Sequence, residues 1–413
     1  MGALGGWAEK VLPSRSTEPP GRRGLPARPR RGRHECTDRP APTAVPRHGT
    51  TPSRAPRPHS ATPRNATEQK DTSMTERPTL AVTVGDPVGI GPEITVRTLL
   101  QVGTTAAARG VVVADAAVLR RALQVCGLDA TVRTLDSWDL PAEEEGTIDC
   151  FDIGVLKDIV LPWGTVDERA GRAAVRAIEV ATRAALERDV AGIVTGPINK
   201  EAIWAAGSEH LGHTEMLGAL TGATRQNTMF VVRGKKIFFA TRHLSLRKAL
   251  DQISVDQQSA QIDEALTALR VFGHDRPRLA VAAINPHGGE NGAFGDEEIM
   301  HLGPAVERAQ ASGADVVGPV PADSVFHQLL QGRFDGVLSQ YHDQGHIAAK
   351  TYDFDGTISV TVGLPILRTS VDHGTAFDIA GTGEADPATM RSAFEHGAGF
   401  AHFADRIRAE YAV

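Results

Sequence analysis

Residues 79–102 read TLAVTVGDPVGIGPEITVRTLLQV, in which an apolar run, a glycine-rich turn and a helical pattern follow one another. The β-branched run TLAVTV predicts a buried strand, and ITVRTLLQV has the spacing of an amphipathic helix. Pro92 suits the first turn of that helix and Glu93 suits its positive end. The turn matches neither G-x-G-x-x-G nor a Walker loop. Two interpretations stay open for it: a tight strand-to-helix turn, or a backbone cradle for an anion.

The same order of strand, turn and helix recurs along the chain. It is repeated in residues 110–123 (GVVVADAAVLRRAL) and in residues 190–203 (VAGIVTGPINKEAI), and an Ala-rich amphipathic helix is predicted at 167–188. Residues 229–250 (MFVVRGKKIFFATRHLSLRKAL) predict two strands joined at Arg233-Gly234. This alternation predicts an α/β fold with a mainly parallel sheet.

The N-terminal region differs from the rest in charge and proline content. Residues 1–73 hold 14 Lys and Arg against 6 Asp and Glu, and 12 of the 25 prolines. Such a segment buries too little apolar surface to offset chain entropy, so we predict a disordered, dispensable extension, with translation starting at Met74 as a further hypothesis. A nucleic-acid arm or a targeting peptide is the functional alternative. Residues 74–413 are the predicted catalytic region.

Composition and cysteine spacing exclude several classes of protein. Hydrophobic residues make up 41% and charged residues 23%, as in soluble globular proteins, and no apolar run approaches the length of a membrane span. The three cysteines are far apart, which argues against a disulfide framework and favours a reducing cytoplasm. The net charge of −6 gives no indication of nucleic-acid binding.

Three histidines stand just after predicted strands: His243, His287 and His342. The carboxyl ends of parallel strands meet at one edge of a sheet, where ligands bind. Neutral imidazole is the usual nitrogen ligand of zinc-like ions, and a catalytic site keeps three protein ligands and an open position. We therefore expect a metal site there, with Asp323 and Asp343 as a further ligand or as orienting groups. The alternative interpretation of each histidine, taken alone, is a hydrogen-bonded surface or capping residue.

The stretch from Ser339 to Asp378 is dense in imidazoles, carboxylates and cations beside apolar strands. Buried polar groups must be paired, so this density indicates part of an active site. Lys350 and Arg368 suit a small anionic substrate, because Arg can hold a phosphate or carboxylate with two hydrogen bonds. The structural alternatives are a pair of Arg368 with Asp372 or Asp378, and a solvated helix end for Lys350.

Polar residues earlier in the chain complete this set. His213 and Thr214 lie in a short polar break and offer hydrogen-bond donors. Lys200 follows the predicted strand of residues 190–195, and is either a site residue or a solvated lysine at a helix start. We expect the general base to be Lys200, Asp323 or Lys350, without a ranking.

Eight motifs resemble the 4-hydroxythreonine-4-phosphate dehydrogenase family and occur in the family's order, from about residue 79 to the C-terminus. They are GDPVGIGPE (85–93), TGPINK (195–200), GHTE (212–215), TRHLSL (241–246), NPHGGENGAFGDEE (285–298), GPVPADSVF (318–326), YHDQGH (341–346) and GLPILRTSVDHGTAFDIAG (363–381).

The resemblance implies a fold, a cofactor and a subunit arrangement. The expected fold is a two-lobed α/β/α fold like that of isocitrate and isopropylmalate dehydrogenases, not a Rossmann dinucleotide fold. We expect lobe 1 at about 74–199 plus 340–413 and lobe 2 at about 200–339. The resemblance implies NAD, with NADP as the alternative, and one divalent ion (Zn, Mg or Co). It also implies a homodimer whose metal site lies near the interface, with ligands from both subunits.

The resemblance also implies roles for single residues. The metal ligands of the family fall on His243, His287 and His342, and its substrate-binding residues fall on His213, Thr214, Lys350, Ser359 and Arg368. The family usually has Asn where this chain has Ser359, and serine is shorter and lacks the amide.

The implied reaction is oxidation at C3 of a 4-phosphorylated four-carbon 3-hydroxy acid, followed by decarboxylation. The first expectation is a 4-hydroxythreonine-4-phosphate dehydrogenase of pyridoxine biosynthesis. The alternative is a dehydrogenase of 4-phospho-D-threonate or 4-phospho-D-erythronate in sugar-acid catabolism, to which NKEA (199–202) and YHDQGHI (341–347) look closer. A metal-dependent hydrolase or lyase of a phosphorylated metabolite is a more remote alternative, and a non-catalytic binding module is less favoured still.

Overall fold

The computed structural model describes residues 77–157 and 159–412. The expectations for residues 1–73 lie outside these ranges. None of the helices in the described part of the chain combines the length and apolarity that a bilayer crossing requires.

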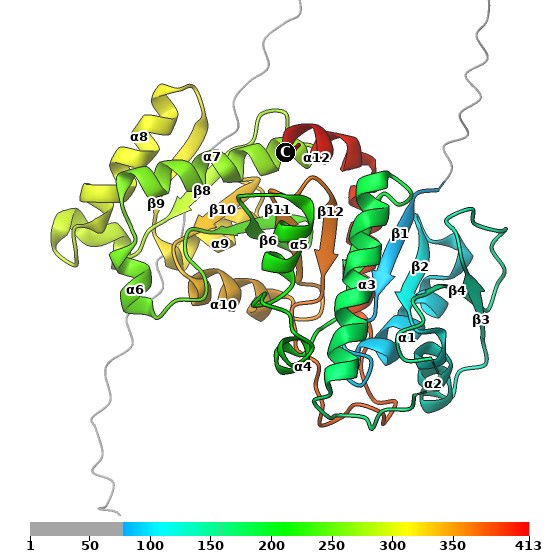
Figure 1. Ribbon diagram of the computed structural model, residues 1–413. Coiled ribbons are helices and arrows are strands. Elements are labelled where there is room, and N and C mark those ends of the chain that lie inside the picture. The colour runs from blue at the N-terminus through cyan, green and yellow to red at the C-terminus, as the bar shows by residue number, and fades with distance from the viewer. Residues whose placement is uncertain (1–76, 158, 413) are drawn as a thin grey trace, which may run out of the picture. The chain divides into compact units, whose positions relative to one another are not determined.

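The described strands form a twelve-stranded sheet in the order β3-β4-β2-β1-β5-β12-β11-β6-β7-β10-β8-β9. Figure 1 shows the sheet extending from β9 at the left to β3 at the right. The strands are β1 (Thr79–Thr83), β2 (Arg109–Ala114), β3 (Thr131–Leu135), β4 (Thr147–Asp152), β5 (Gly192–Thr195), β6 (Asn227–Val232), β7 (Lys235–Phe239), β8 (Arg278–Ala282), β9 (Asp315–Val320), β10 (Gly336–Ser339), β11 (Ile358–Val362) and β12 (Leu367–Ser370).

Helices alternate with these strands, as predicted. The α-helices are α1 (Gly91–Val102), α2 (Ala116–Cys126), α3 (Glu168–Glu187), α4 (Lys200–Ala205), α5 (His213–Thr221), α6 (Leu246–Asp251), α7 (Val255–Val271), α8 (Gly303–Ala311), α9 (Ala322–Leu330), α10 (His342–Tyr352), α11 (Ala388–Phe400) and α12 (Ala404–Glu410). Shorter helical segments are η1 (Gly103–Thr105), η2 (Pro286–Gly292), η3 (Glu298–Leu302) and η4 (Ala401–Phe403).

The sheet is mainly parallel, which confirms the prediction, but it contains two parallel sets that run in opposite directions. One set is β3, β4, β2, β1, β5 and β12, and the other is β7, β10, β8 and β9. The antiparallel pairs β12-β11, β11-β6 and β6-β7 join them. The predicted hairpin at Arg233-Gly234 is the connection between β6 and β7, and both turn residues have positive φ.

Helices pack on both faces of the sheet because strand side chains alternate between the faces. Leu80 of β1 belongs to a core cluster with Ile94 of α1 and Leu269 of α7. The next residue, Ala81, packs with Ile178 of α3 in a separate cluster. Helices α9 and α10 share a further cluster with β6, β7 and β10. The expected α/β/α layering is therefore confirmed, whereas the division into two lobes stays a prediction.

The turn after β1 is held by protein groups. The amide of Asp86 donates to the carbonyl of Pro197 at 2.8 Å. Gly85 has φ +75° and lies so close to Pro197 that an added Cβ would come within 2.1 Å of the carbonyl oxygen. Glu93 is buried and accepts hydrogen bonds from two backbone amides, those of Gly381 and Gly383. These contacts favour the tight-turn interpretation over an anion cradle.

Candidate active site

A cavity of about 620 Å³ brings together most of the predicted site residues. Seven different parts of the chain line it, and they include four of the histidines and three of the cations discussed below. Its lining includes Lys200, His213, Thr214, Glu215, Thr228, Phe230, Arg242, His243, His342, His346, Ser359, Arg368, Ser370, Asp372 and His373. A larger cavity of about 1000 Å³ shares Arg242 with it but contains none of the predicted site residues. The smaller cavity is therefore the candidate active site.

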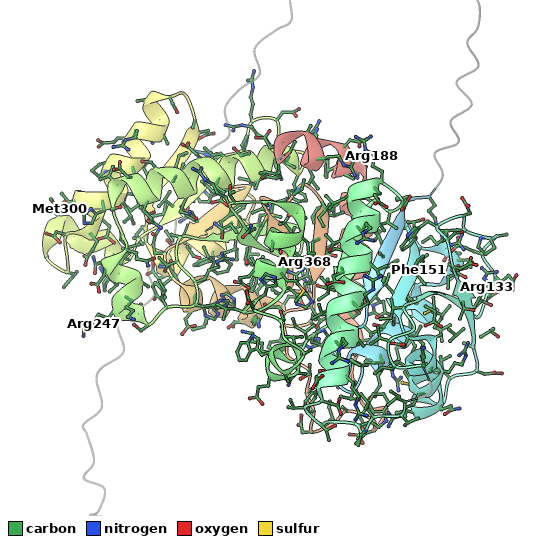
Figure 2. All side chains as sticks on the ribbon, in the orientation of Figure 1. Arg133, Phe151, Arg188, Arg247, Met300 and Arg368 are labelled. Carbon is green, nitrogen blue, oxygen red and sulfur yellow. The ribbon has the colours of Figure 1, made fainter. Side chains whose placement is uncertain are left out.

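Arg368 lies on β12, near the middle of the sheet, and only 5% of its surface is exposed (Figure 2). Its Nε and Nη2 donate to the hydroxyl of Thr195 at 3.0 and 2.8 Å, and its Nη1 donates to the hydroxyl of Thr361 at 2.8 Å. Burial lowers the pKa of Arg368 to about 10. Because no carboxylate among the described residues forms an ion pair with this guanidinium, the buried charge is suited to an anionic ligand.

The structure does not form the pair of Arg368 with Asp372 that was the alternative interpretation. Asp372 instead accepts from the Nζ of Lys350 at 2.6 Å through Oδ2, and its carbonyl accepts from the same nitrogen at 3.1 Å. Lys350 is therefore anchored beside the cavity and is not a freely solvated helix end.

His213 begins α5, after Gly212, and its Nε2 is buried without a hydrogen-bond partner among the described residues. Burial, followed by the charge of Arg368, lowers the pKa of His213 well below its usual value. Thr214 lies beside it on the cavity wall. A buried, unpartnered nitrogen is costly unless a ligand satisfies it, so His213 and Arg368 together are a candidate anion subsite.

The three candidate metal ligands follow neighbouring parallel strands in the order β7-β10-β8, as predicted. The ring centroids of His243 and His342 are 6.0 Å apart. His287 lines neither the candidate active site nor the larger cavity. It is exposed, and its Nδ1 lies 3.2 Å from a carboxylate oxygen of Glu290. Residues 287–291 all have positive φ, which sets the path of this loop.

The two assembled histidines have the chemistry that a divalent ion requires. The Nδ1 of His342 lies 2.6 Å from Oδ1 of Asp343, which leaves Nε2 as the nitrogen with the lone pair. Burial lowers the pKa of His243, which favours the neutral, ligating form. No group of three or more His, Cys, Asp or Glu side chains within residues 77–157 and 159–412 is arranged to hold a metal ion. The described chain thus brings two of the three expected imidazoles close together, and their role as metal ligands stays a prediction.

The remaining predicted residues divide between the cavity and its surroundings. Lys200 begins α4 and lines the cavity. Ser359 is buried on β11, opposite Ser370 of β12, and also lines it. Asp323 lies exposed in the first turn of α9 and is not among the lining residues.

Several lining residues lie outside the predicted site set, and Arg242 and His346 are two of them. Arg242 donates to the hydroxyl of Thr228 and, at 3.2 Å, to the carbonyl of Gln226. His346 stacks on His342, and burial lowers its pKa to about 4. Both lie within motifs named above, TRHLSL and YHDQGH. His346 also belongs to the polar stretch 339–378 that was predicted to be part of the active site, but only in a supporting role, whereas nothing in the sequence singled out Arg242.

The chain is similar to known proteins over most of its described length. The family model described as "Pyridoxal phosphate biosynthetic protein PdxA" matches residues 106–397. A relative from Cutibacterium acnes, named "Putative D-threonate 4-phosphate dehydrogenase", is 57% identical over 339 residues, which cover 82% of this chain and 98% of the relative. A relative of the same name from Symbiobacterium thermophilum is 48% identical, over 81% of this chain and all of the relative.

A solved structure shows the same relationship in three dimensions. The crystal structure of 4-hydroxythreonine-4-phosphate dehydrogenase from Klebsiella pneumoniae is 43% identical and superposes with a TM-score of 0.74, covering 80% of this chain and 99% of that chain. Both the family model and the relatives span most of the described chain. They confirm the family that the eight sequence motifs indicated. The chain belongs to the PdxA family.

Proposed function

We propose that this protein is a dehydrogenase that oxidises the C3 hydroxyl of a 4-phosphorylated four-carbon hydroxy acid, with a nicotinamide cofactor as hydride acceptor. Family membership supports the dehydrogenase class, since the relatives and the solved structure carry dehydrogenase names. The observation that carries the proposal is the buried guanidinium of Arg368 beside the unpartnered Nε2 of His213. Such a pair calls for an anion such as a phosphate or a carboxylate.

We propose 4-phospho-D-threonate as the substrate. The relatives of that name are 57% and 48% identical to this chain, whereas the Klebsiella pneumoniae structure is 43% identical. The charges of the cavity support this choice. Asp372 already pairs with Lys350, so Glu215 is the lining carboxylate left to balance Lys200, Arg242 and Arg368. A C2 hydroxyl is easier to place among these cations than a C2 ammonium.

The second candidate is 4-phosphohydroxy-L-threonine, which carries that ammonium. The likeness to the Klebsiella pneumoniae 4-hydroxythreonine-4-phosphate dehydrogenase, with its TM-score of 0.74, keeps this substrate in consideration. Ser359, where the family usually has Asn, lies on the cavity wall and is the residue most directly placed to change a substrate contact.

One anionic end of the substrate has proposed partners. Arg368, His213 and Thr214 would hold one anionic end, and the anchored Lys350 would complete the charge on that side. Binding energy from this remote contact would fix C3 against the nicotinamide. The cofactor itself, NAD or NADP, remains a proposal taken from the family.

A divalent ion fits the two assembled imidazoles. We propose that His243 and His342 of one subunit hold it together with His287 from a second copy of the chain, in a homodimer. Bound there, a Zn, Mg or Co ion would supply Lewis acidity that lowers the pKa of the substrate hydroxyl. This arrangement explains why a single chain brings together two of the three histidines.

The proposed base is Lys200. It lines the cavity, whereas Lys350 is engaged by Asp372 and Asp323 lies away from the lining. In the reaction, the C3–H bond breaks with transfer of hydride to the nicotinamide, and the hydroxyl proton passes to the base. The resulting 3-keto acid loses its C1 carboxylate as CO2, and a proton adds at C2.

The decisive experiment compares kcat/KM for 4-phospho-D-threonate, 4-phospho-D-erythronate and 4-phosphohydroxy-L-threonine, with NAD and with NADP, by absorbance at 340 nm. We expect the highest value for 4-phospho-D-threonate with NAD. A higher value for 4-phosphohydroxy-L-threonine would reverse the choice of substrate. No reduction of either cofactor with any of the three would refute the proposed reaction and favour a hydrolase or lyase.

A further inference from the structure

His346 is a half-buried part of the cavity wall for which the proposed reaction has no use. It lies on α10, one helical turn after His342, so the two side chains emerge on the same face of the helix. Their rings are stacked, with centroids 3.6 Å apart and planes inclined by 14°.

The ring of His346 is held by independent contacts. Its Nδ1 donates to the carbonyl oxygen of His342 at 2.8 Å, which places the proton on that nitrogen. The rings of Phe230 and Phe239 lie against it at centroid distances of 4.3 and 4.6 Å. Rotation of the imidazole would break this hydrogen bond and disrupt the aromatic contacts. His346 is thus a fixed, flat surface.

His342 has fewer contacts of its own. Its side chain is 39% exposed, and its Nδ1 is oriented by Asp343, whose side chain is 70% exposed. Because the Asp343 side chain is so exposed, its carboxylate restrains the ring of His342 only weakly. The stacked ring of His346 restrains the same imidazole from its flat face, which a hydrogen bond at the ring edge does not do.

We propose that His346 is a positioning residue, whose ring fixes the plane in which His342 presents Nε2 to the cavity. This inference rests on the proposed function, in which His342 holds a divalent ion. The competing explanation is that His346 only fills space against the two phenylalanines. The two explanations require different side chains at position 346. Positioning of His342 requires a flat ring that stacks on it, whereas filling the space beside the phenylalanines requires only a side chain of similar volume.

The test measures binding of Co²⁺ to the metal-stripped protein by visible absorption, together with thermal unfolding. His346→Leu fills the volume without a flat ring, and His346→Phe keeps a flat ring without the hydrogen bond. We expect the Kd for Co²⁺ to rise by about 10-fold to 100-fold in His346→Leu, as for other groups that orient metal ligands, and to change less than about threefold in His346→Phe. The absorption bands of the bound Co²⁺ should shift only in His346→Leu.

The chain offers a matched control in His396. Its Nδ1 donates to the carbonyl of Ser392, four residues earlier on α11, at 2.9 Å, and it lines neither cavity. His396→Leu should leave the Kd for Co²⁺ unchanged. If His346→Leu is not folded at the assay temperature, His346→Gln, which keeps a donor for the carbonyl but lacks a ring, replaces it with the same expected loss.

The outcomes separate this inference from the proposed function. An unchanged Kd in His346→Leu, with or without a lower melting temperature, would overturn the positioning role and leave the metal site intact. Equal losses in His346→Leu and His346→Phe would also overturn it, because a flat ring would then not matter. Failure of the native protein to bind Co²⁺ would remove both the metal role and the inference.

Discussion

At the scale of single residues, the main lesson concerns Arg368. Its position in GLPILRTSV identified it as a substrate residue by resemblance, but the sequence also permitted an ion pair with Asp372 or Asp378. The structure resolves this choice through packing, because β12 lies between β5 and β11 and turns the guanidinium toward threonine hydroxyls. Sequence spacing alone does not reveal whether a buried arginine forms an ion pair with a nearby aspartate.

Replacing Arg368 tests the anion subsite. In Arg368→Met we expect kcat/KM to fall by at least about 100-fold, chiefly through KM, because hydrogen bonds to a charged group contribute roughly 1.5 to 3 kcal/mol each. The free energy of unfolding without ligand should stay within about 1 kcal/mol of the native value, since a buried unpaired charge is removed. Inorganic phosphate should raise the melting temperature of the native protein but not that of the variant.

The matched control is Arg183→Met on the exposed face of α3, which lines neither cavity. It should leave kinetics and the phosphate effect unchanged. Native-like stabilisation of Arg368→Met by phosphate would contradict the proposed subsite.

At the scale of elements, the strand–turn–helix units, the hairpin and the long helix could be predicted because their periodicity is local. The predicted helix at 167–188 is α3, Glu168–Glu187, capped by Asp167. The location of His287 could not be predicted in the same way. It depends on a run of positive φ values in a glycine-rich loop, and such a path is set by tertiary contacts.

The long helix α3 is linked to the candidate active site by its contact with α4, which begins at Lys200. A Cβ added at Gly171 would lie 2.0 Å from the carbonyl oxygen of Ala202, two residues after Lys200 on α4. We expect Gly171→Ala to destabilise the protein by roughly 3 kcal/mol and to lower kcat, because α4 must move away. Urea unfolding and steady-state kinetics measure both effects.

Gly399→Ala on α11 is the control for this prediction. A Cβ there meets nothing within 4 Å, so alanine should stabilise the helix by roughly 0.5 to 1 kcal/mol. If Gly171→Ala behaves like Gly399→Ala, the close approach of the two helices is not as described.

The turn after β1 predicts a pH dependence. Burial raises the pKa of Asp86 to about 6, although the amide of Val88 donates to its Oδ1 at 3.0 Å. A carboxyl whose pKa is raised on folding contributes stability below its unfolded pKa, and this contribution is lost as the pH rises through about 6. Between pH 4 and pH 8 the loss should be roughly 2 kcal/mol.

Asp86→Asn should lack this component of the pH profile while keeping an oxygen for the amide of Val88. The measurement is the free energy of unfolding in urea at pH 4, 6 and 8 for both proteins. Parallel profiles would show that Asp86 ionises in the folded protein as freely as in the unfolded chain.

At the scale of the whole molecule, the α/β class, the layering and the family could be predicted from eight ordered motifs. The opposite directions of the two parallel sets could not, because strand direction depends on how distant segments pair. The same limit applies to the subunit arrangement, which the sequence indicates only by resemblance. A shared site can be tested without a structure of the dimer.

Mixing two inactive variants tests that arrangement. His287→Ala should retain its stability, because the side chain is exposed, but should lose activity, as should His342→Ala. Co-refolding equal amounts should restore about a quarter of the native activity, since half of the random dimers are mixed and each has one intact site. Samples mixed without refolding are the control, and persistent inactivity after refolding would contradict a site shared between subunits.

The central place of β11 and β12 has a consequence for biosynthesis on the ribosome. Both strands come late in the chain, yet they pair between β5 and β6. Until residue 370 has emerged, the nascent polypeptide exposes unpaired backbone on β5 and β6, edges that favour misassociation with other strands. Ser359 lies on β11 and Arg368 lies on β12, so the substrate subsite can form only when these two strands pair with β5 and β6 and complete the sheet. Messenger RNAs truncated before the codon for residue 370 would yield fragments that are prone to aggregate and have no catalytic activity.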